Sequence, residues 1–244
     1  MTSINMNKDN IYSELQNVVD FVFDENVANV FSDMIRRSVP GYESIVTMLG
    51  VFAEQYVKQG SNVYDLGCSL GASTLSIRSR LKDTPCQMIA VDNSEAMVEK
   101  CRVNINLASG PDVDVICNDI RNIDINNASL AVLNFTLQFL PLADRESLLG
   151  KIADNLLPGG ALVLSEKIAF EDDNEARLNE ELHLAFKKAN GYSELEIAQK
   201  RSAIENVLIP ETLNAHLERL QQAGFKQSQV WFQCMNFVSI IAIK

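Results

Sequence analysis

The sequence predicts a doubly wound α/β fold with a mainly parallel sheet. Apolar runs of strand length alternate with helical patterns, as crossover connections between parallel strands require. Strands are expected at residues 62–66, 86–92, 113–118, 129–139 and 161–168. Helices are expected between them, at residues 72–81, 95–108 and 142–157. With 244 residues, 47% of them hydrophobic, the chain can bury the core of one domain without needing a second.

The first strand ends in a glycine-rich turn that carries an acid. Asp65 lies two positions before Gly67, and Gly71 precedes the next helix. Glycines let backbone N–H groups approach a ligand, and the helix N-terminus adds partial positive charge. A dinucleotide-binding turn has a different glycine spacing and holds a diphosphate, which the Asp65 carboxylate would repel. The turn therefore favours the zwitterionic amino acid and sulfonium of S-adenosyl-L-methionine, although any strand-to-helix turn can carry glycines.

Polar side chains close the next three strands. Asp92 ends the second strand, at the spacing where such folds hold a ribose hydroxyl. Asp119 follows the third strand and can accept the adenine amino group, while Ile120 can cover the adenine ring. Asn134 is the early polar residue of the fourth strand, which passes the expected place of the reactive methyl. Each acid alone could cap the helix that follows it, but three acids at consecutive strand ends indicate a ligand.

The C-terminal part completes the predicted sheet. Pro158, Gly159 and Gly160 stop the third helix and turn the chain into the fifth strand, because proline and paired glycines disfavour a continued helix. Residues 231–243 hold two further apolar runs that meet near Asn236. A hairpin there gives a seven-stranded sheet whose last strand is antiparallel.

Two helical segments lie outside this repeating unit. Residues 1–58 contain helical patterns around a turn at 39–42, and residues 171–209 form a polar insertion that is expected to cover the substrate. Both are expected to belong to a single domain over residues 1–244. His183 and His216 lie in helical patterns without ligand-spaced partners. They are assigned to surface or packing roles, and no metal site is expected.

The net charge, the hydropathy and the cysteines indicate which partners and which cellular compartment to expect. A net charge of −11 repels phosphate backbones, so direct binding of nucleic acid is not expected. The sequence has neither an apolar run of membrane-spanning length nor a signal peptide at its start, which predicts a cytoplasmic protein without membrane attachment. Its five cysteines lack metal-ligand spacing and are expected to be reduced. Cys68 lies in the glycine turn without a histidine nearby in sequence, which argues against a nucleophilic role.

Four stretches together resemble the carboxy-S-adenosyl-L-methionine synthases. They are Asp65–Gly71, Val91–Ser94, Asn118–Ile120 and Gly191–Arg201, and the likeness extends to Asp20–Asp24 and Trp231–Cys234. The resemblance implies a class I methyltransferase (Rossmann-like) fold that does not transfer a methyl group. Members convert S-adenosyl-L-methionine and prephenate to carboxy-S-adenosyl-L-methionine and phenylpyruvate. The product serves a tRNA carboxymethyltransferase that modifies the wobble uridine.

The resemblance also implies a cofactor site and an assembly. The site residues that it implies are Tyr42, Gly67, Cys68, Ser69, Asp92, Asn93, Asp119, Ile120, Asn134 and Arg201. Members are homodimers, and the apolar residues within 20–31 are expected to help bury a symmetric interface.

The chemistry assigns Arg201 the catalytic part. The methyl on the sulfonium is acidic, and the resulting ylide can capture carbon dioxide released from prephenate. The new carboxylate needs a partner, and an arginine fork meets both of its oxygens. Without the resemblance, Arg201 beside Lys200 would be taken as a solvated charge. Whether Arg201 acts in its own or a partner's site stays open.

The sequence offers no convincing protein base for removing the methyl proton. No histidine lies in a motif, and the acids at the strand ends are assigned to the cofactor. Prephenate expels hydroxide as its ring aromatises, so the substrate itself can supply the base. The alternatives are an ordinary small-molecule methyltransferase, in which Arg201 is not needed, and a non-enzymic cofactor-bound module.

Overall fold

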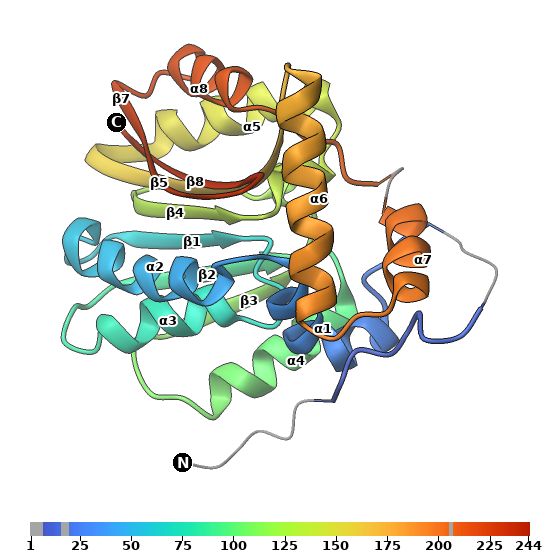
Figure 1. Cartoon of the computed structure of the whole chain (residues 1–244). Coiled ribbons are helices and arrows are strands. Elements are labelled where there is room, and N and C mark those ends of the chain that lie inside the picture. The colour runs from blue at the N-terminus through green and yellow to red at the C-terminus, as the bar shows by residue number, and fades with distance from the viewer. Residues whose placement is uncertain (1–6, 16–19, 205–206) are drawn as a thin grey trace.

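The computed structural model describes residues 7–15, 20–204 and 207–244, which form one sheet with helices on both faces (Figure 1). The sheet has eight strands in the order β3-β2-β1-β4-β5-β8-β7, and β6 pairs with β5 beside this path. The strands are β1 (Asn62–Leu66), β2 (Gln87–Asp92), β3 (Val113–Cys117), β4 (Ala128–Asn134), β5 (Leu156–Ala169), β6 (Glu211–Thr212), β7 (Gln227–Cys234) and β8 (Phe237–Ile243).

The parallel part of the sheet brings the predicted strand ends to one edge. β1 pairs in parallel with β2 and β4, and the register places Asp65 opposite Ala90. β2 pairs in parallel with β3, so Asp92 lies opposite Cys117. β8 runs antiparallel between β5 and β7, which confirms the predicted closing hairpin. The side chains that end β1, β2, β3 and β4 therefore meet at one side of the sheet.

Helices cover the two faces of the sheet. Their bounds are α1 (Glu25–Ser38), α2 (Tyr42–Tyr56), α3 (Ala72–Arg80), α4 (Glu95–Asn106), α5 (Leu142–Asn155), α6 (Asp173–Ala189), α7 (Glu194–Ile204) and α8 (Leu213–Gln222). On one face, Leu49 of α2 and Ile77 of α3 pack on Val63 and Val132. On the other, Leu149 of α5 joins a core cluster that also includes Leu220 of α8. Burial of these apolar side chains is the main force that holds the layers together.

Three details differ from the sequence prediction. β4 ends at Asn134 rather than 139, because Phe135 has a φ of 62° and a 3₁₀ turn follows at Leu137–Phe139. β5 begins at Leu156 rather than 161, so the residues predicted to form a turn before this strand belong to the strand itself. Its pairing with β4 shifts register between Ala128 and Leu130. The seven strands of the continuous path agree with the prediction, and the two-residue β6 is an additional strand that it lacked.

The two helical segments outside the repeating unit lie together. α1 and α2 meet at the predicted turn, where Gly41 has a φ of 76° and any Cβ would lie 2.2 Å from the ring of Phe232. Phe21 and Val27 are buried in a cluster with Met97 of α4 and Ala203 of α7. Figure 1 shows α6 crossing the edge at which β1 and β4 end. The N-terminal segment and the insertion thus close over the carboxyl edge of the sheet.

Candidate functional site

A cavity of about 400 Å³ opens at the carboxyl edge of the sheet, a volume typical of small-molecule sites. Its wall combines the turns after β1, β2, β3 and β4 with side chains from α1, α2, β5, α6 and α7. Most of the predicted site residues line it, namely Tyr42, Gly67, Cys68, Ser69, Asp92, Asn93, Asp119, Ile120 and Asn134. Asp65 and Arg201 are not among its lining residues.

The glycine turn after β1 is held in a strained conformation against the cavity. Gly67 has a φ of 90°, and a Cβ there would lie 2.2 Å from Oγ1 of Thr136. Ser69 has a φ of 49°, which is uncommon for a residue with a side chain. Its backbone N–H donates to Oδ2 of Asp92 at 2.9 Å. Only glycine fits at position 67, and the Asp92 carboxylate fixes the strained serine.

Asp92 is a carboxylate held by backbone groups in the cavity wall. Oδ2 accepts from Ser69, and Oδ1 accepts the N–H of Ser94 at 2.9 Å. Burial raises the pKa of Asp92 above its usual value, while hydrogen bonds from Ser94 and Ser69 oppose that rise. Each carboxylate oxygen has a second lone pair. Asp92 is therefore anchored and can still accept hydrogen bonds from a ligand.

Beneath the cavity, Asp65 is almost fully buried. Its Oδ2 accepts from Oγ1 of Thr74 at 2.5 Å, whereas its Oδ1 has no hydrogen-bond partner among the described residues. Burial raises the pKa of Asp65 to about 6. Its charge in turn adds to the effect of burial in raising the pKa of Tyr42, which lines the cavity. Asp65 thus acts on the cavity from below and does not form its surface.

Asn134 leaves a second buried acceptor without a donor. Its Nδ2 donates to Oγ of Ser73 at 3.1 Å, and within the described part of the chain its Oδ1 has no partner. Buried acceptors normally find a donor, because an unsatisfied one costs about 1–3 kcal/mol. The free oxygen of Asn134 suits a ligand that brings N–H donors, and the charge of Asp65 below the cavity favours a positively charged one. The amino acid end of S-adenosyl-L-methionine fits that requirement.

Asp119 takes part in an ion-pair network that the sequence analysis did not predict. Its Oδ2 pairs with NH2 of Arg121 at 2.6 Å, and Arg121 also pairs with Asp144 at 2.5 Å. Hydrogen bonding to Arg121 lowers the pKa of Asp119. Asp119 also caps the short turn at Ile120–Asn122, the ordinary role that the sequence had left open. Asp119 and Ile120 nevertheless both lie in the cavity wall.

Arg201 lies outside the wall of the cavity. Its guanidinium pairs with Glu180 of α6, and its side chain is 57% exposed. Its charge still contributes to lowering the pKa of Lys167 and Lys187, two cavity residues. The assigned role of Arg201 therefore stays a prediction that requires a movement of this side chain or a second chain.

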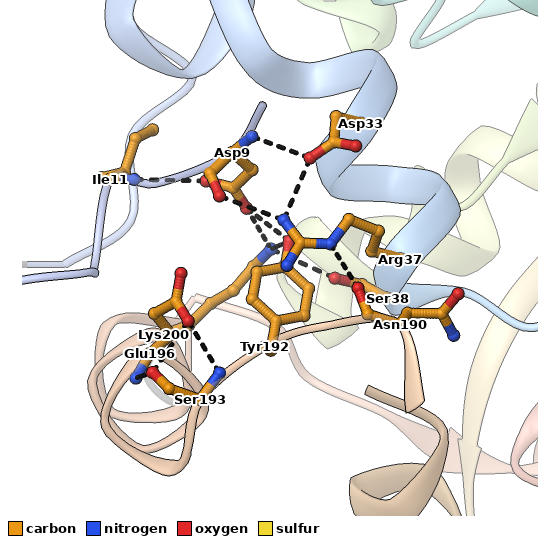
Figure 2. Close-up of polar contacts among 10 residues, drawn as sticks. All are labelled: Asp9, Ile11, Asp33, Arg37, Ser38, Asn190, Tyr192, Ser193, Glu196 and Lys200. Atoms are coloured by element: carbon orange, nitrogen blue, oxygen red, sulfur yellow. Dashed lines mark hydrogen bonds and ion pairs between the residues drawn. The ribbon is translucent and has the colours of Figure 1, made fainter. Parts of the chain in front are cut away.

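Lys200, the residue before Arg201, points inward instead. Its Nζ lies 3.5 Å from Oδ2 of Asp9, 3.1 Å from Oγ of Ser38 and 3.4 Å from the hydroxyl of Tyr192 (Figure 2). Arg37 stacks over the ring of Tyr192 at 3.7 Å. Burial lowers the pKa of Lys200 to about 8, partly opposed by Asp9. Lys200 lines the cavity together with Lys167 and Lys187.

The sequence analysis missed the cationic side of the cavity. Lys167 lies near the carboxyl end of β5, which meets the site, so the rule applied to the acids could have found it. Lys187 and Lys200 lie on helices whose contacts the sequence did not predict. His183, assigned to packing or the surface, also lines the cavity, and its Nε2 donates to the carbonyl of Ser38 at 2.8 Å. Burial lowers the pKa of His183 to about 3, so the ring is neutral.

Cys68 is a buried thiol and not a nucleophile in this environment. A hydrogen bond with Cys101 and burial both raise its pKa far above the usual value. The thiol therefore stays protonated at neutral pH. In the described ranges, no three His, Cys, Asp or Glu side chains are grouped closely enough to hold a metal ion.

Two solved structures that resemble this chain agree with the fold. Over 90% of this chain, human N-acetylserotonin methyltransferase in complex with S-adenosyl-L-methionine superposes with a TM-score of 0.61 at 17% identity; the match covers 55% of that protein. An O-methyltransferase family protein from Burkholderia thailandensis gives a TM-score of 0.60 at 20% identity, over 91% of this chain and 60% of its own. Residues 63–160 match the family model described as a methyltransferase domain. At these identities, the two superpositions show the fold alone.

Sequence relatives are much more similar. Two proteins named carboxy-S-adenosyl-L-methionine synthase, from Shewanella baltica and Shewanella putrefaciens, are each 58% identical over 243 residues. In both cases the match covers 99% of this chain and all of the relative. The chain therefore belongs to the carboxy-S-adenosyl-L-methionine synthase family.

Proposed function

We propose that this enzyme converts S-adenosyl-L-methionine and prephenate to carboxy-S-adenosyl-L-methionine and phenylpyruvate. The observation that carries the proposal is the 58% identity over the full length of proteins named for this product. The cavity supports it further, because one side offers carboxylates and the other offers ammonium groups. A sulfonium substrate and an acidic co-substrate need those opposite environments.

On this proposal, the predicted residues hold S-adenosyl-L-methionine from its adenine to its amino acid. Asp92 accepts the ribose hydroxyls with the lone pairs that Ser69 and Ser94 leave free. Asp119 accepts the adenine amino group, and Ile120 covers the ring. Asn93, Cys68 and the backbone of the glycine turn close the pocket around the adenosine.

The amino acid end then lies toward β4 and α2. The unpartnered Oδ1 of Asn134 accepts from the ligand ammonium, and Asp65 contributes its charge from beneath. Tyr42 forms the neighbouring wall. The ammonium would thus satisfy the acceptor that the described residues leave open.

The reaction balances without a protein base. Prephenate loses carbon dioxide and hydroxide as its ring aromatises, which leaves phenylpyruvate. Hydroxide takes a proton from the methyl to form water, and the methyl carbon bonds carbon dioxide. The chain binds both substrates, orients them and excludes water. The neutral, hydrogen-bonded imidazole of His183 supports this division of labour, since its low pKa makes it a poor base.

One observation favours the alternative of an ordinary methyltransferase. That activity leaves Arg201 unneeded, and Arg201 is paired with Glu180 outside the cavity. The relatives' names weigh more than the position of one exposed side chain. On the synthase proposal, Arg201 leaves Glu180 to meet the transferred carboxylate, in its own site or in the partner's.

The wider assignment follows the family resemblance. We propose one domain over residues 1–244, a cytoplasmic homodimer, and a product consumed by a tRNA carboxymethyltransferase without direct binding of nucleic acid by this chain. The net charge of −11 supports the last point. In the ranges that the structure describes, no helix has the length and apolar character needed to span a bilayer.

Mass spectrometry tests the proposal directly. The purified protein is incubated with S-adenosyl-L-methionine, with and without prephenate. A nucleoside product heavier by one carboxyl group, formed only with prephenate and together with phenylpyruvate, is the expected result. S-adenosylhomocysteine formed with an acceptor substrate would instead identify a methyltransferase.

A further inference from the structure

Three lysines from three different elements face one end of the cavity. Lys167 comes from β5, Lys187 from α6 and Lys200 from α7. Each of these side chains is buried or half-buried. Lysine is strongly hydrated and rarely leaves water without a partner. A convergence of three ammonium groups on one cavity therefore needs an explanation.

The three lysines differ in their partners. Lys200 is fixed by Asp9, Ser38 and Tyr192. The ammonium groups of Lys167 and Lys187, in contrast, make no hydrogen bond or ion pair in residues 7–15, 20–204 and 207–244. Lys188, next to Lys187 on the same helix, points to the surface, where it pairs with Glu194 at 2.7 Å. The inward pair thus faces the cavity with its donors free.

The environment of this pair is unfavourable for charge. Burial, together with the positive charges of Lys200, Lys167 and Arg201, lowers the pKa of Lys187 to about 7. Burial likewise lowers the pKa of Lys167, with Glu180 opposing the shift. Buried cations are stabilised by an anion in contact with them. None of the described side chains supplies one to Lys187.

The position of the pair separates it from the cofactor residues. Asp92 and Asp119 lie at the ends of β2 and β3, whereas Lys167 lies on β5, beyond β1 and β4 in the sheet order. Phe237 of β8 and His183 of α6 line the same end as the lysines and contact each other at 4.9 Å between rings. An apolar wall beside paired cations suits a cyclic or aromatic acid.

We propose that Lys167 and Lys187 form the carboxylate subsite of the second substrate, a cyclic dicarboxylate. This inference rests on the proposed function, under which the dicarboxylate is prephenate. Two ammonium groups match two carboxylates, and Lys200 adds positive potential from its fixed position. Once one carboxylate has left as carbon dioxide, the product has a single carboxylate and can form fewer ion pairs with the two lysines. The subsite therefore binds substrate more tightly than product.

Binding without turnover tests the subsite. The protein is saturated with S-adenosylhomocysteine, which lacks the reacting methyl, and prephenate is titrated into it by calorimetry. Lys167→Met and Lys187→Met should each weaken prephenate binding about tenfold or more, since each removes a charged hydrogen-bond donor. Lys187→Arg should retain most of the affinity. The affinity for S-adenosylhomocysteine should not change, which also verifies that each variant is folded.

Lys188→Met is the matched control and should bind prephenate as wild type does, because that ammonium points to solvent. Unchanged prephenate affinity in both inward variants, or no binding by wild type, overturns the subsite. Equal weakening of S-adenosylhomocysteine binding also overturns it, since the lysines would then serve the nucleoside. If the variants weaken prephenate binding but wild type forms no carboxylated product, the subsite stands and the proposed function fails.

Discussion

Lys200 and Asp9 lie 191 positions apart in the chain, yet their charged groups form a buried ion pair at 3.5 Å. Asp9 also accepts a hydrogen bond from Tyr192, and its backbone N–H donates to Asp33 of α1 at 2.7 Å (Figure 2). The pair therefore ties the N-terminal segment to α1 and α7. Because Lys200 lines the cavity, the same contact shapes the ligand site.

Loss of the Asp9 carboxylate should destabilise the fold around the cavity. We expect Asp9→Ala to lower the free energy of unfolding by about 3 kcal/mol, since it leaves the Lys200 ammonium buried without its anion. Chemical denaturation measures this change. Glu14→Ala, an exposed acid in the same segment, is the control and should change stability by less than about 0.5 kcal/mol. Equal stability of the two variants would contradict this role of the ion pair.

Much of the fold could be predicted because it follows from local patterns. β1 has the predicted bounds because it is a buried apolar run, and α3 begins at the predicted Ala72 because a glycine turn precedes it. The end of β4 could not be predicted in this way. Residues 135–139 continue the apolar pattern, but the N–H groups of Leu137 and Gln138 donate to the buried carboxylate of Glu166. That contact with β5 is not visible in the local sequence.

The candidate site likewise has a part that local sequence patterns predict and a part that depends on contacts between distant segments. Its acidic side could be predicted because parallel strands place their carboxyl ends at one edge, which brings Asp92 and Asp119 together. On its cationic side, the same rule could have found Lys167 of β5 but not Lys187, which reaches the cavity only through the packing of α6 across that edge. Sequence alone also does not distinguish Lys200 from Arg201. One residue along α7 rotates the side chain by about 100°, enough to exchange the cavity for solvent.

Asp92 should be necessary for binding S-adenosyl-L-methionine. We expect Asp92→Ala to weaken binding by about 2–3 kcal/mol or more, because the variant loses the carboxylate assigned to both ribose hydroxyls. The loss also frees the N–H groups of Ser69 and Ser94, which loosens the turns on either side. Calorimetry measures the affinity. Asp114→Ala, at an exposed position of β3, should bind normally. Unchanged affinity in folded Asp92→Ala would place the ribose elsewhere.

Binding of S-adenosyl-L-methionine should strengthen as the pH rises through about 6. Burial raises the pKa of Asp65 to about 6, so below that pH the carboxyl is protonated and attracts the ligand ammonium less. Above it the group is ionised and affinity levels off. Calorimetry between pH 5 and 8 provides the profile.

Asp65→Asn shows whether the pH dependence comes from Asp65 or from Asp92, because burial also raises the pKa of Asp92. The variant should bind more weakly at pH 8 and should lose most of the pH dependence. A profile identical to that of wild type would exclude Asp65 as its source.

The protein should be a dimer in solution. Light scattering should give twice the 27.1 kDa mass of the chain. The apolar residues first expected at the interface are partly used within the chain, since Phe21 and Val27 are buried there. Leu178 and Leu182 of α6 remain 54% and 46% exposed, one helical turn apart. We therefore expect Leu178→Glu with Leu182→Glu to shift the mass toward the monomer, whereas Val103→Glu on α4 should not. A monomeric wild type at micromolar concentration would refute the assembly.

Arg201 provides the sharpest distinction between a synthase and a methyltransferase. If it meets the transferred carboxylate, wild type should bind carboxy-S-adenosyl-L-methionine more tightly than S-adenosyl-L-methionine by about 2–4 kcal/mol. Arg201→Ala should lose most of that margin and leave the affinity for S-adenosyl-L-methionine unchanged. Arg201→Lys should recover only part, because an ammonium keeps the charge but not the two-pronged geometry. Competition binding measures all three.

Glu180→Gln shows whether the observed ion pair opposes that role. Arg201 must leave Glu180 to reach a carboxylate in the cavity, so weakening this contact should keep or increase the preference for the carboxylated ligand. If Arg201→Ala instead retains the full preference, the carboxylate is held by other groups, and Lys167 and Lys187 are cations of the cavity wall that could hold it. Lys167→Met and Lys187→Met would then remove the margin that Arg201→Ala had left, which would assign recognition of the transferred carboxylate to β5 and α6.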